Sequence, residues 1–200
     1  SAAGHYEAAP VEAGIYKISN AGQLYWFAKL VDGGELDANA VLTADITVNA
    51  EGEERKWNAI GSNGKKYSGT FDGQGHSISG LYADSRWDYF GLFGNLDTDG
   101  IIKDVTVKDS YICAHKGVGA IVGRMGIGES GYLKRDGGQV IGCGSDNNIV
   151  CSNAKTTSTG KYVGGVVGFN RYGTIEDCWN TGAVYGREDI GGVVGYTTGD

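Results

Sequence analysis

The sequence lacks several features that mark common classes of protein. It holds a single proline, Pro10, among 200 residues, and it has no Gly-X-Y period. Its 36 glycines therefore indicate neither collagen nor a disordered linker. Glycine adopts positive φ angles without steric cost, so abundant glycine beside Val, Ile and Tyr indicates short strands joined by tight turns.

Basic clusters and long apolar runs are also missing. The net charge is −7, and no basic run is longer than a pair such as Lys65-Lys66. Because nucleic-acid binding requires a basic footprint, we exclude a nucleic-acid partner. No apolar stretch is long enough to cross a bilayer, so we expect no membrane insertion by this segment. An acidic chain rich in Gly, Asn, Thr and Tyr fits a secreted or cell-surface protein.

Two motifs recur along the chain. The first places glycines around apolar residues, and its equivalent glycines are Gly91, Gly119, Gly164 and Gly191. The second runs from a glycine through apolar residues, and it starts at Gly100, Gly138 and Gly173. The first set is spaced by 28, 45 and 27 residues, which gives a unit near 27 residues interrupted by insertions around residues 124–137 and 152–160.

A unit of this length matches one coil of a β-solenoid. Its apolar stretches, residues 101–107, 111–113 and 118–122, are broken by Gly, Asn and Asp, and no helix pattern intervenes. Such a unit buries its apolar face only by stacking on its neighbours. We therefore predict an all-β fold, a parallel β-helix, with the right-handed winding that parallel crossover connections adopt.

The N-terminal part has a different pattern. Residues 1–15 show no clear pattern and are expected to form an extension. Residues 20–32 predict a helix, because four apolar residues recur at helical spacing. These residues are Leu24, Phe27, Ala28 and Val31. We expect the helix to cap the open end of the solenoid, and the first strand to follow at residues 41–48.

Residues 16–200 are expected to form one solenoid domain. It divides into a helical cap (16–34), irregular first coils (35–88) and regular repeats (89–200). The chain stops inside a fourth repeat, so we interpret it as a fragment of a longer protein, with further repeats or domains C-terminal to it.

The repeated segments resemble the GLUG-motif family, named for the core that appears here as Gly91-Leu92-Phe93-Gly94. Residues 68–81, and residues 42–46 followed by 57–61, are similar to the segments that precede such repeats. The resemblance implies a secreted or surface location in bacteria, in adhesins or beside the catalytic domains of immunoglobulin-A peptidases. It implies no catalytic residues.

The four cysteines fall into two aligned pairs. Counted from the second motif, Cys143 aligns with Cys178 and also with Val105, whereas Cys113 aligns with Cys151. We expect each pair to stack across neighbouring coils in a structural role. Buried thiols and disulfides both fit this placement, while the spacing matches no zinc or redox motif.

No motif for catalysis, cofactor binding or metal binding stands out. The three histidines, His5, His76 and His115, are far apart in sequence. Residues 117–123 miss the spacing of a dinucleotide fingerprint, and no helix follows them. Four aspartates fit turns, where Asp bonds its own backbone, with Ca²⁺ binding or acid–base catalysis as the alternative. They are Asp97, Asp99, Asp104 and Asp109. We predict no enzyme activity, no cofactor and no metal.

Exposed aromatic residues are the candidates for binding. Trp87 and Tyr89 lie in a polar turn, and Tyr132 and Arg135 lie in the insertion at residues 124–137. Aromatic rings with a polar handle bind sugars and proteins, although such rings also cover the edges of coils. Because insertions into a regular solenoid often carry function, we predict a recognition surface formed by this insertion with Trp87 nearby.

The predicted function is that of a non-catalytic module of a bacterial secreted or cell-surface protein. It acts in adhesion, in ligand binding or as a rigid spacer, with a host glycan or protein as its partner. One alternative is a recognition or spacer region of a larger secreted peptidase or carbohydrate-active enzyme. A second alternative is a polysaccharide-degrading β-helix enzyme.

Overall fold

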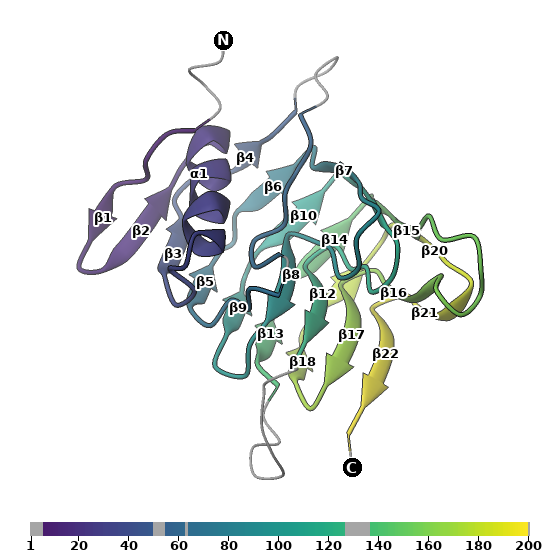
Figure 1. Ribbon diagram of the computed structural model, residues 1–200. Helices are drawn as coiled ribbons and strands as arrows, with labels where there is room; N and C mark the ends of the chain where they lie inside the picture. Colours follow the sequence, from purple (N-terminus) through teal and green to yellow (C-terminus); the bar gives the residue numbers. More distant parts are fainter. Residues whose placement is uncertain (1–5, 50–54, 63, 127–136, 200) are drawn as a thin grey trace.

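The computed structural model describes residues 6–49, 55–62, 64–126 and 137–199. In this part of the chain the fold is all-β apart from one helix, α1, and the sheets consist mainly of parallel strand pairs. Figure 1 shows the strands of each sheet lying side by side, from β1 and β2 near the N-terminus to the strands near the C-terminus.

The helix α1 (Ala21–Asp32) forms where the apolar spacing predicts it. The side chain of Asn20 accepts a hydrogen bond from the Gln23 N–H at 2.9 Å, which satisfies one of the free N–H groups of the first turn. The helix ends at Gly33. The four residues of its predicted apolar face are all buried in the core. The helix prediction is confirmed to within one residue.

A hairpin precedes the helix, which the sequence pattern did not indicate. β1 (Val11–Glu12) and β2 (Ile15–Ile18) pair in antiparallel fashion. The turn between them uses Ala13 and Gly14 at φ angles of 51° and 77°. β2 then pairs in parallel with β3 (Asn39–Leu42), so the hairpin extends the same sheet.

From residue 70 onward, each unit contributes one strand to each of four sheets, in the same order every time. Sheet A holds β5 (Thr70–Asp72), β9 (Ile101–Lys103), β13 (Gln139–Ile141) and β18 (Thr174–Glu176), beside β1, β2 and β3. Sheet B holds β4 (Ile46–Thr47), β6 (Ser77–Ser79), β10 (Thr106–Lys108), β14 (Gly144–Asp146) and β19 (Trp179–Asn180).

The other two large sheets follow the same rule. Sheet C holds β7 (Tyr82–Asp84), β11 (Tyr111–Ala114), β15 (Ile149–Ser152) and β20 (Ala183–Tyr185). Sheet D holds β8 (Phe93–Leu96), β12 (Val122–Met125), β17 (Val167–Arg171) and β22 (Val194–Thr198). In the last two units a further pair, β16 (Lys161–Gly164) and β21 (Glu188–Gly191), lies in the chain between sheets C and D.

The register aligns equivalent residues of neighbouring units. Val140 in β13 pairs with Ile102 on one side and Ile175 on the other. Ile102 and Val140 are fully buried, and their neighbours along the strand are partly exposed, as the alternation of a strand requires. The core is therefore a set of apolar ladders enclosed by the sheets.

Residues with positive φ angles lie where the chain turns from sheet A into sheet B. Asp104, Gly142 and Asp177 follow equivalent strands, and their φ angles are 52°, 65° and 52°. Asp and Gly tolerate this conformation better than other residues. Asp109, at the next corner, has a φ angle of 48°. These aspartates occupy turn positions, as expected.

The predicted strand boundaries are wrong in three places. The strand expected at residues 41–48 follows two earlier strands and is split between β3 and β4, which belong to different sheets. The strand expected at residues 101–107 is broken at Asp104 into β9 and β10. The strand expected at residues 118–122 begins only at Val122, because the preceding residues turn between sheets C and D.

Candidate binding site at the turns between sheets C and D

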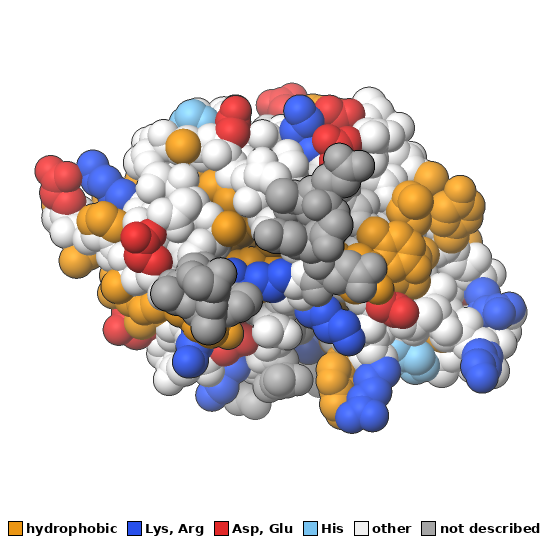
Figure 2. All heavy atoms as spheres, turned by 90° about the horizontal axis from the view of Figure 1, so that it is seen from above, with side chains coloured by type: hydrophobic (Ala, Val, Ile, Leu, Met, Phe, Trp, Pro, Cys, Tyr) orange, Lys and Arg blue, Asp and Glu red, His pale blue; other side chains and the backbone are white. Residues whose placement is uncertain are grey.

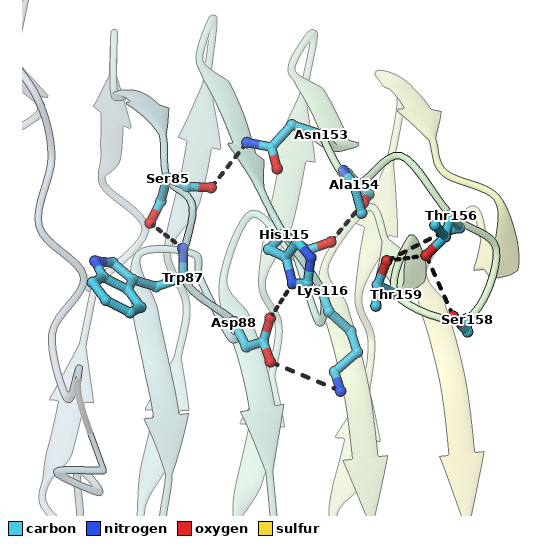
Figure 3. A network of polar contacts seen from close by, with 11 residues as sticks. Ser85, Trp87, Asp88, His115, Lys116, Asn153, Ala154, Thr156, Ser158 and Thr159 are labelled. Atoms are coloured by element: carbon cyan, nitrogen blue, oxygen red, sulfur yellow. Dashed lines mark hydrogen bonds and ion pairs between the residues drawn. The ribbon is translucent and has the colours of Figure 1, made fainter.

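The connections from sheet C to sheet D carry a group of polar contacts between units. We call residues 85–89, 115–117 and 153–160 the turn stack. Asn153 Nδ2 donates to Asp84 Oδ1 at 2.8 Å and to the Ser85 carbonyl oxygen at 2.9 Å. Ser152 Oγ donates to the His115 carbonyl oxygen at 2.6 Å. Figure 3 shows the contact between Ser85 and Asn153, with His115 of the intervening unit beside it.

Asp88 links its own turn to the next one. Its Oδ1 lies 2.7 Å from His115 Nδ1, and its Oδ2 lies 3.8 Å from Lys116 Nζ. Trp87 extends from the same turn in a different direction, away from these contacts (Figure 3). The Ser85 hydroxyl accepts a hydrogen bond from the Trp87 N–H at 3.1 Å, which fixes the backbone that presents the indole.

An open pocket of about 350 Å³ lies beside this turn. It is lined by Gly64, Arg86, Trp87, Asp88, Tyr89, Asn95, His115 and Arg124. Its volume is at the lower end of the range of about 300–1,000 Å³ that is typical of small-molecule sites. Figure 2 shows hydrophobic side chains gathered on the half of the viewed face that carries the C-terminal strands, with basic side chains along its lower edge.

Two arginines in the pocket pack on aromatic rings. The Cζ atom of Arg86 lies 4.8 Å from the centroid of the Trp87 ring, and Trp87 is still 60% exposed. The Cζ atom of Arg124 lies 3.8 Å from the centroid of the Tyr89 ring. Cation–π contacts of this kind hold a guanidinium in place while leaving its edges available.

Asn95 fixes Arg124 from the other side. Its Oδ1 accepts a hydrogen bond from Arg124 Nε at 3.0 Å, and its Nδ2 donates to the Gly61 carbonyl oxygen at 2.9 Å. Asn95 is buried, and its strand pairs in register with that of Arg124. Within the described residues, no carboxylate forms an ion pair with Arg86 or Arg124.

The structure brings together only part of the predicted site. Trp87 and Tyr89 line the same pocket. Tyr132 and Arg135 lie outside the described residues, as does most of the insertion predicted at residues 124–137. Arg124 itself belongs to the regular repeat rather than to the insertion, because it pairs in register with Asn95 and Phe169.

Sequence reasoning missed His115 as a pocket residue, and it placed Arg124 in the insertion of the predicted recognition surface rather than in the regular repeat. The signal that could have found His115 is the repeat alignment, which places His115 and Lys116 at the turn equivalent to residues 87–89. No group of three His, Cys, Asp or Glu side chains placed to hold a metal ion occurs among the described residues. The described part of the chain also has no helix long and apolar enough to cross a membrane.

The cysteines pair as the repeat alignment predicts. Cys113 and Cys151 lie opposite each other in β11 and β15 and form a disulfide, with Cα atoms 4.5 Å apart. Cys143 and Cys178 are free thiols in adjacent strand ends, where the Trp179 N–H bonds the Cys143 carbonyl. Cys143 belongs to the hydrophobic core, as its alignment with Val105 indicates.

Comparison with known sequences identifies the repeat. The sequence pattern of the GLUG motif matches residues 159–185. The chain carries a GLUG motif. The matched GLUG stretch runs from the end of the turn stack through β16 and β17 to β20, so it covers one complete unit with a strand in every sheet. The resemblance drawn from the sequence is thereby confirmed.

Two sequence relatives share a shorter part of the chain. Halomucin of Haloquadratum walsbyi is 36% identical over 92 residues, which cover 41% of this chain and 1% of halomucin. A protein of Evansella cellulosilytica named "Putative Gly-rich membrane protein" is 28% identical over 82 residues, covering 40% of this chain and 9% of that protein. The chain thus matches a small fraction of each relative's length.

A solved structure shares the fold over nearly the whole chain. The crystal structure of a protein from Bacteroides ovatus, named "putative immunoglobulin A1 protease", matches with a TM-score of 0.69 at 24% sequence identity. The match covers 98% of this chain and 66% of that protein. At this level of identity the likeness concerns the fold.

Proposed function

We propose that this chain is a non-catalytic module of a secreted or cell-surface protein and that it binds a ligand at the pocket beside Trp87. In this proposal the four sheets wind as a right-handed parallel β-solenoid, and α1 caps its N-terminal end. The constant order of the sheets from unit to unit supports the solenoid. The packing of Phe27 on Phe71 and Tyr67, with ring centroids 6.0 and 6.2 Å apart, supports the cap.

The names of the sequence relatives that share these repeats support the surface location. The sequence relatives are named halomucin and a Gly-rich membrane protein, and the GLUG motif resembles repeats of secreted bacterial proteins. The disulfide between Cys113 and Cys151 fits an oxidising compartment, where such bonds persist.

The observation that carries the binding proposal is the exposure of Trp87 at the rim of a preformed pocket. An indole that is 60% exposed costs free energy in water, and its turn is held by hydrogen bonds to neighbouring units. A rigid aromatic ring loses little conformational entropy on binding, so it suits recognition of sugars and proteins. The pocket lining includes one carboxylate, Asp88, whereas glycoside hydrolysis usually needs two, which supports a binding role.

The proposal is tested by screening the chain against arrays of host glycans and host proteins, followed by calorimetric titration of each hit. We expect the Trp87→Ala variant to lose binding. Trp179→Ala is the matched control, because Trp179 is also exposed, at 42%, but lies in sheet B. A hit that survives Trp87→Ala, or the lack of any hit, contradicts the proposal and favours a spacer.

A further inference from the structure

The charge of the pocket differs in sign from that of the whole chain. The chain carries a net charge of −7, yet the pocket is lined by Arg86, Arg124, His115 and a single acid, Asp88. Asp88 is already bound to His115 and to Lys116. The two guanidiniums are therefore the charges that remain available to a ligand.

Arg124 is held as a preorganised anion receptor. Its Nε is occupied by the Asn95 Oδ1 at 3.0 Å, and its plane is fixed 3.8 Å from the Tyr89 ring centroid. Within the described residues its Nη atoms make no hydrogen bond. A guanidinium whose orientation is fixed before binding gains more from a carboxylate, because its fork matches the two oxygens and little side-chain freedom is lost.

Trp87 supplies the second half of the site. An exposed indole offers a flat apolar face, which suits the C–H face of a sugar ring. Trp87 and Arg124 line the same pocket, so a single sugar residue can contact both the indole face and the guanidinium group. A volume of about 350 Å³ suits one or two sugar units rather than a long peptide.

From this combination we infer that the pocket binds a carboxylated sugar, with its ring on Trp87 and its carboxylate at the Arg124 guanidinium. The inference rests on the proposed function, since it names the ligand class of the same pocket. Arg86 stands 4.8 Å above the Trp87 ring and adds a second positive charge at the rim. An acidic polysaccharide therefore offers this pocket both a sugar ring for Trp87 and a carboxylate for Arg124.

The test uses acidic oligosaccharides and their methyl esters, which have the same sugars without the charge. Oligogalacturonate, a hyaluronate tetrasaccharide and oligosialate serve as probes, and binding to the 200-residue chain is measured by calorimetry. We expect at least one free acid to bind about tenfold to hundredfold more tightly than its ester, the range that one charge-assisted hydrogen bond supplies. Added salt should weaken binding of the acid but not of the ester.

Variants separate the two halves of the site. Arg124→Gln should abolish the preference for the acid while leaving the weak binding of the ester, and Arg124→Lys should restore part of the preference. Trp87→Ala should weaken binding of both forms. Arg171→Gln is the control, because Arg171 is exposed and stacks near Tyr172, at 5.6 Å, outside the pocket. Thermal unfolding of each variant checks that the fold is intact.

The outcomes are distinguishable. If every acid and its ester bind equally, the inference is wrong while the proposed function stands. If a polyglutamate peptide of matched charge binds as tightly as the oligosaccharides, the site recognises charge alone and the inference is also wrong. If no probe binds and the array gives no hit, the proposed function itself fails and the inference with it.

Discussion

Cys143 and Cys178 face each other from neighbouring units as thiols with different surroundings. The hydrogen bond from Cys143 lowers the pKa of Cys178 to about 7, because it stabilises the thiolate. The same hydrogen bond, together with burial, raises the pKa of Cys143. Cys178 is the more exposed of the two, so it is the thiol that ionises first.

This difference predicts selective alkylation. The rate of reaction of Cys178 with iodoacetamide should rise with a midpoint near pH 7, whereas Cys143 should stay unreactive in the folded chain. In Cys143→Ala the midpoint should move toward the ordinary thiol value of about 8.5, because the Cys178 thiolate loses the hydrogen-bond donor that stabilises it. Mass spectrometry of the alkylated peptides measures both rates. An unchanged midpoint in this variant would contradict the assigned cause.

The same shift has a consequence for stability. The pKa of Cys178 is lower in the folded state than in the unfolded chain, so its thiolate stabilises the fold at a pH above the unfolded value, and the contribution is lost as pH falls through about 7. The raised pKa of Cys143 acts in the opposite sense at alkaline pH, where the unfolded thiol ionises and the folded one does not.

Individual strands and the helix show how far local sequence determines structure. The bounds of α1 follow from signals within a dozen residues, the apolar spacing and the Asn20 cap, and the prediction is accurate there. Asn20→Ala should lower the free energy of unfolding by about 1 kcal/mol, because the Gln23 N–H loses its acceptor. Chemical denaturation measures the change. Asn20→Ser, which keeps an acceptor, should cost little, and equal losses in the two variants would contradict the capping role.

The ends of the short strands could not be predicted in this way. Asp104 was expected in a turn, yet the strand expected at residues 101–107 ran through it. The break between β9 and β10 is clear only in the stacked units, where the left-handed Asp104 lies beside the left-handed Gly142. The sequence pattern also placed Arg124 in an insertion, because only its pairing with Asn95 in the neighbouring strand shows that it continues the repeat. Trp87 and Tyr89 were recognised from local pattern alone, as aromatic residues within a polar turn.

The glycines of the GLUG stretch allow a test at the level of one unit. Gly165 and Gly192 are equivalent in neighbouring units, next to the paired residues Gly164 and Gly191. A Cβ atom at Gly165 would overlap the Gly192 carbonyl oxygen and the Asn180 side chain, whereas a Cβ atom at Gly192 would meet no atom within 4 Å. The same substitution should therefore have different effects at the two positions.

Gly165→Ala should destabilise the chain by about 1–3 kcal/mol, the usual cost of overpacking. Gly192→Ala should change its stability by less than about 0.5 kcal/mol. Differential scanning calorimetry of the two variants measures the contrast. Equal losses would contradict the close approach of neighbouring units as the cause and would point to backbone entropy instead.

For the whole molecule, the disulfide is the one covalent link between units within the described residues. It closes a segment with a sequence separation of 38 residues. Such a loop restricts the unfolded chain and should contribute about 4 kcal/mol to the free energy of unfolding. The double variant Cys113→Ser with Cys151→Ser should lose this amount in urea denaturation. Dithiothreitol should destabilise the original chain by a similar amount and leave the double variant unchanged, and any other pattern would contradict a bonded pair.

The link between β11 and β15 also determines how the molecule yields when it is pulled from its two ends. Units not enclosed by the bond can detach one after another, but the 38-residue segment between Cys113 and Cys151 cannot lengthen while the bond is intact. If the bond were broken, that segment could extend to roughly 130 Å. Under shear, a surface protein with this bond would keep the enclosed segment folded. The segment would extend only where a reductant breaks the disulfide.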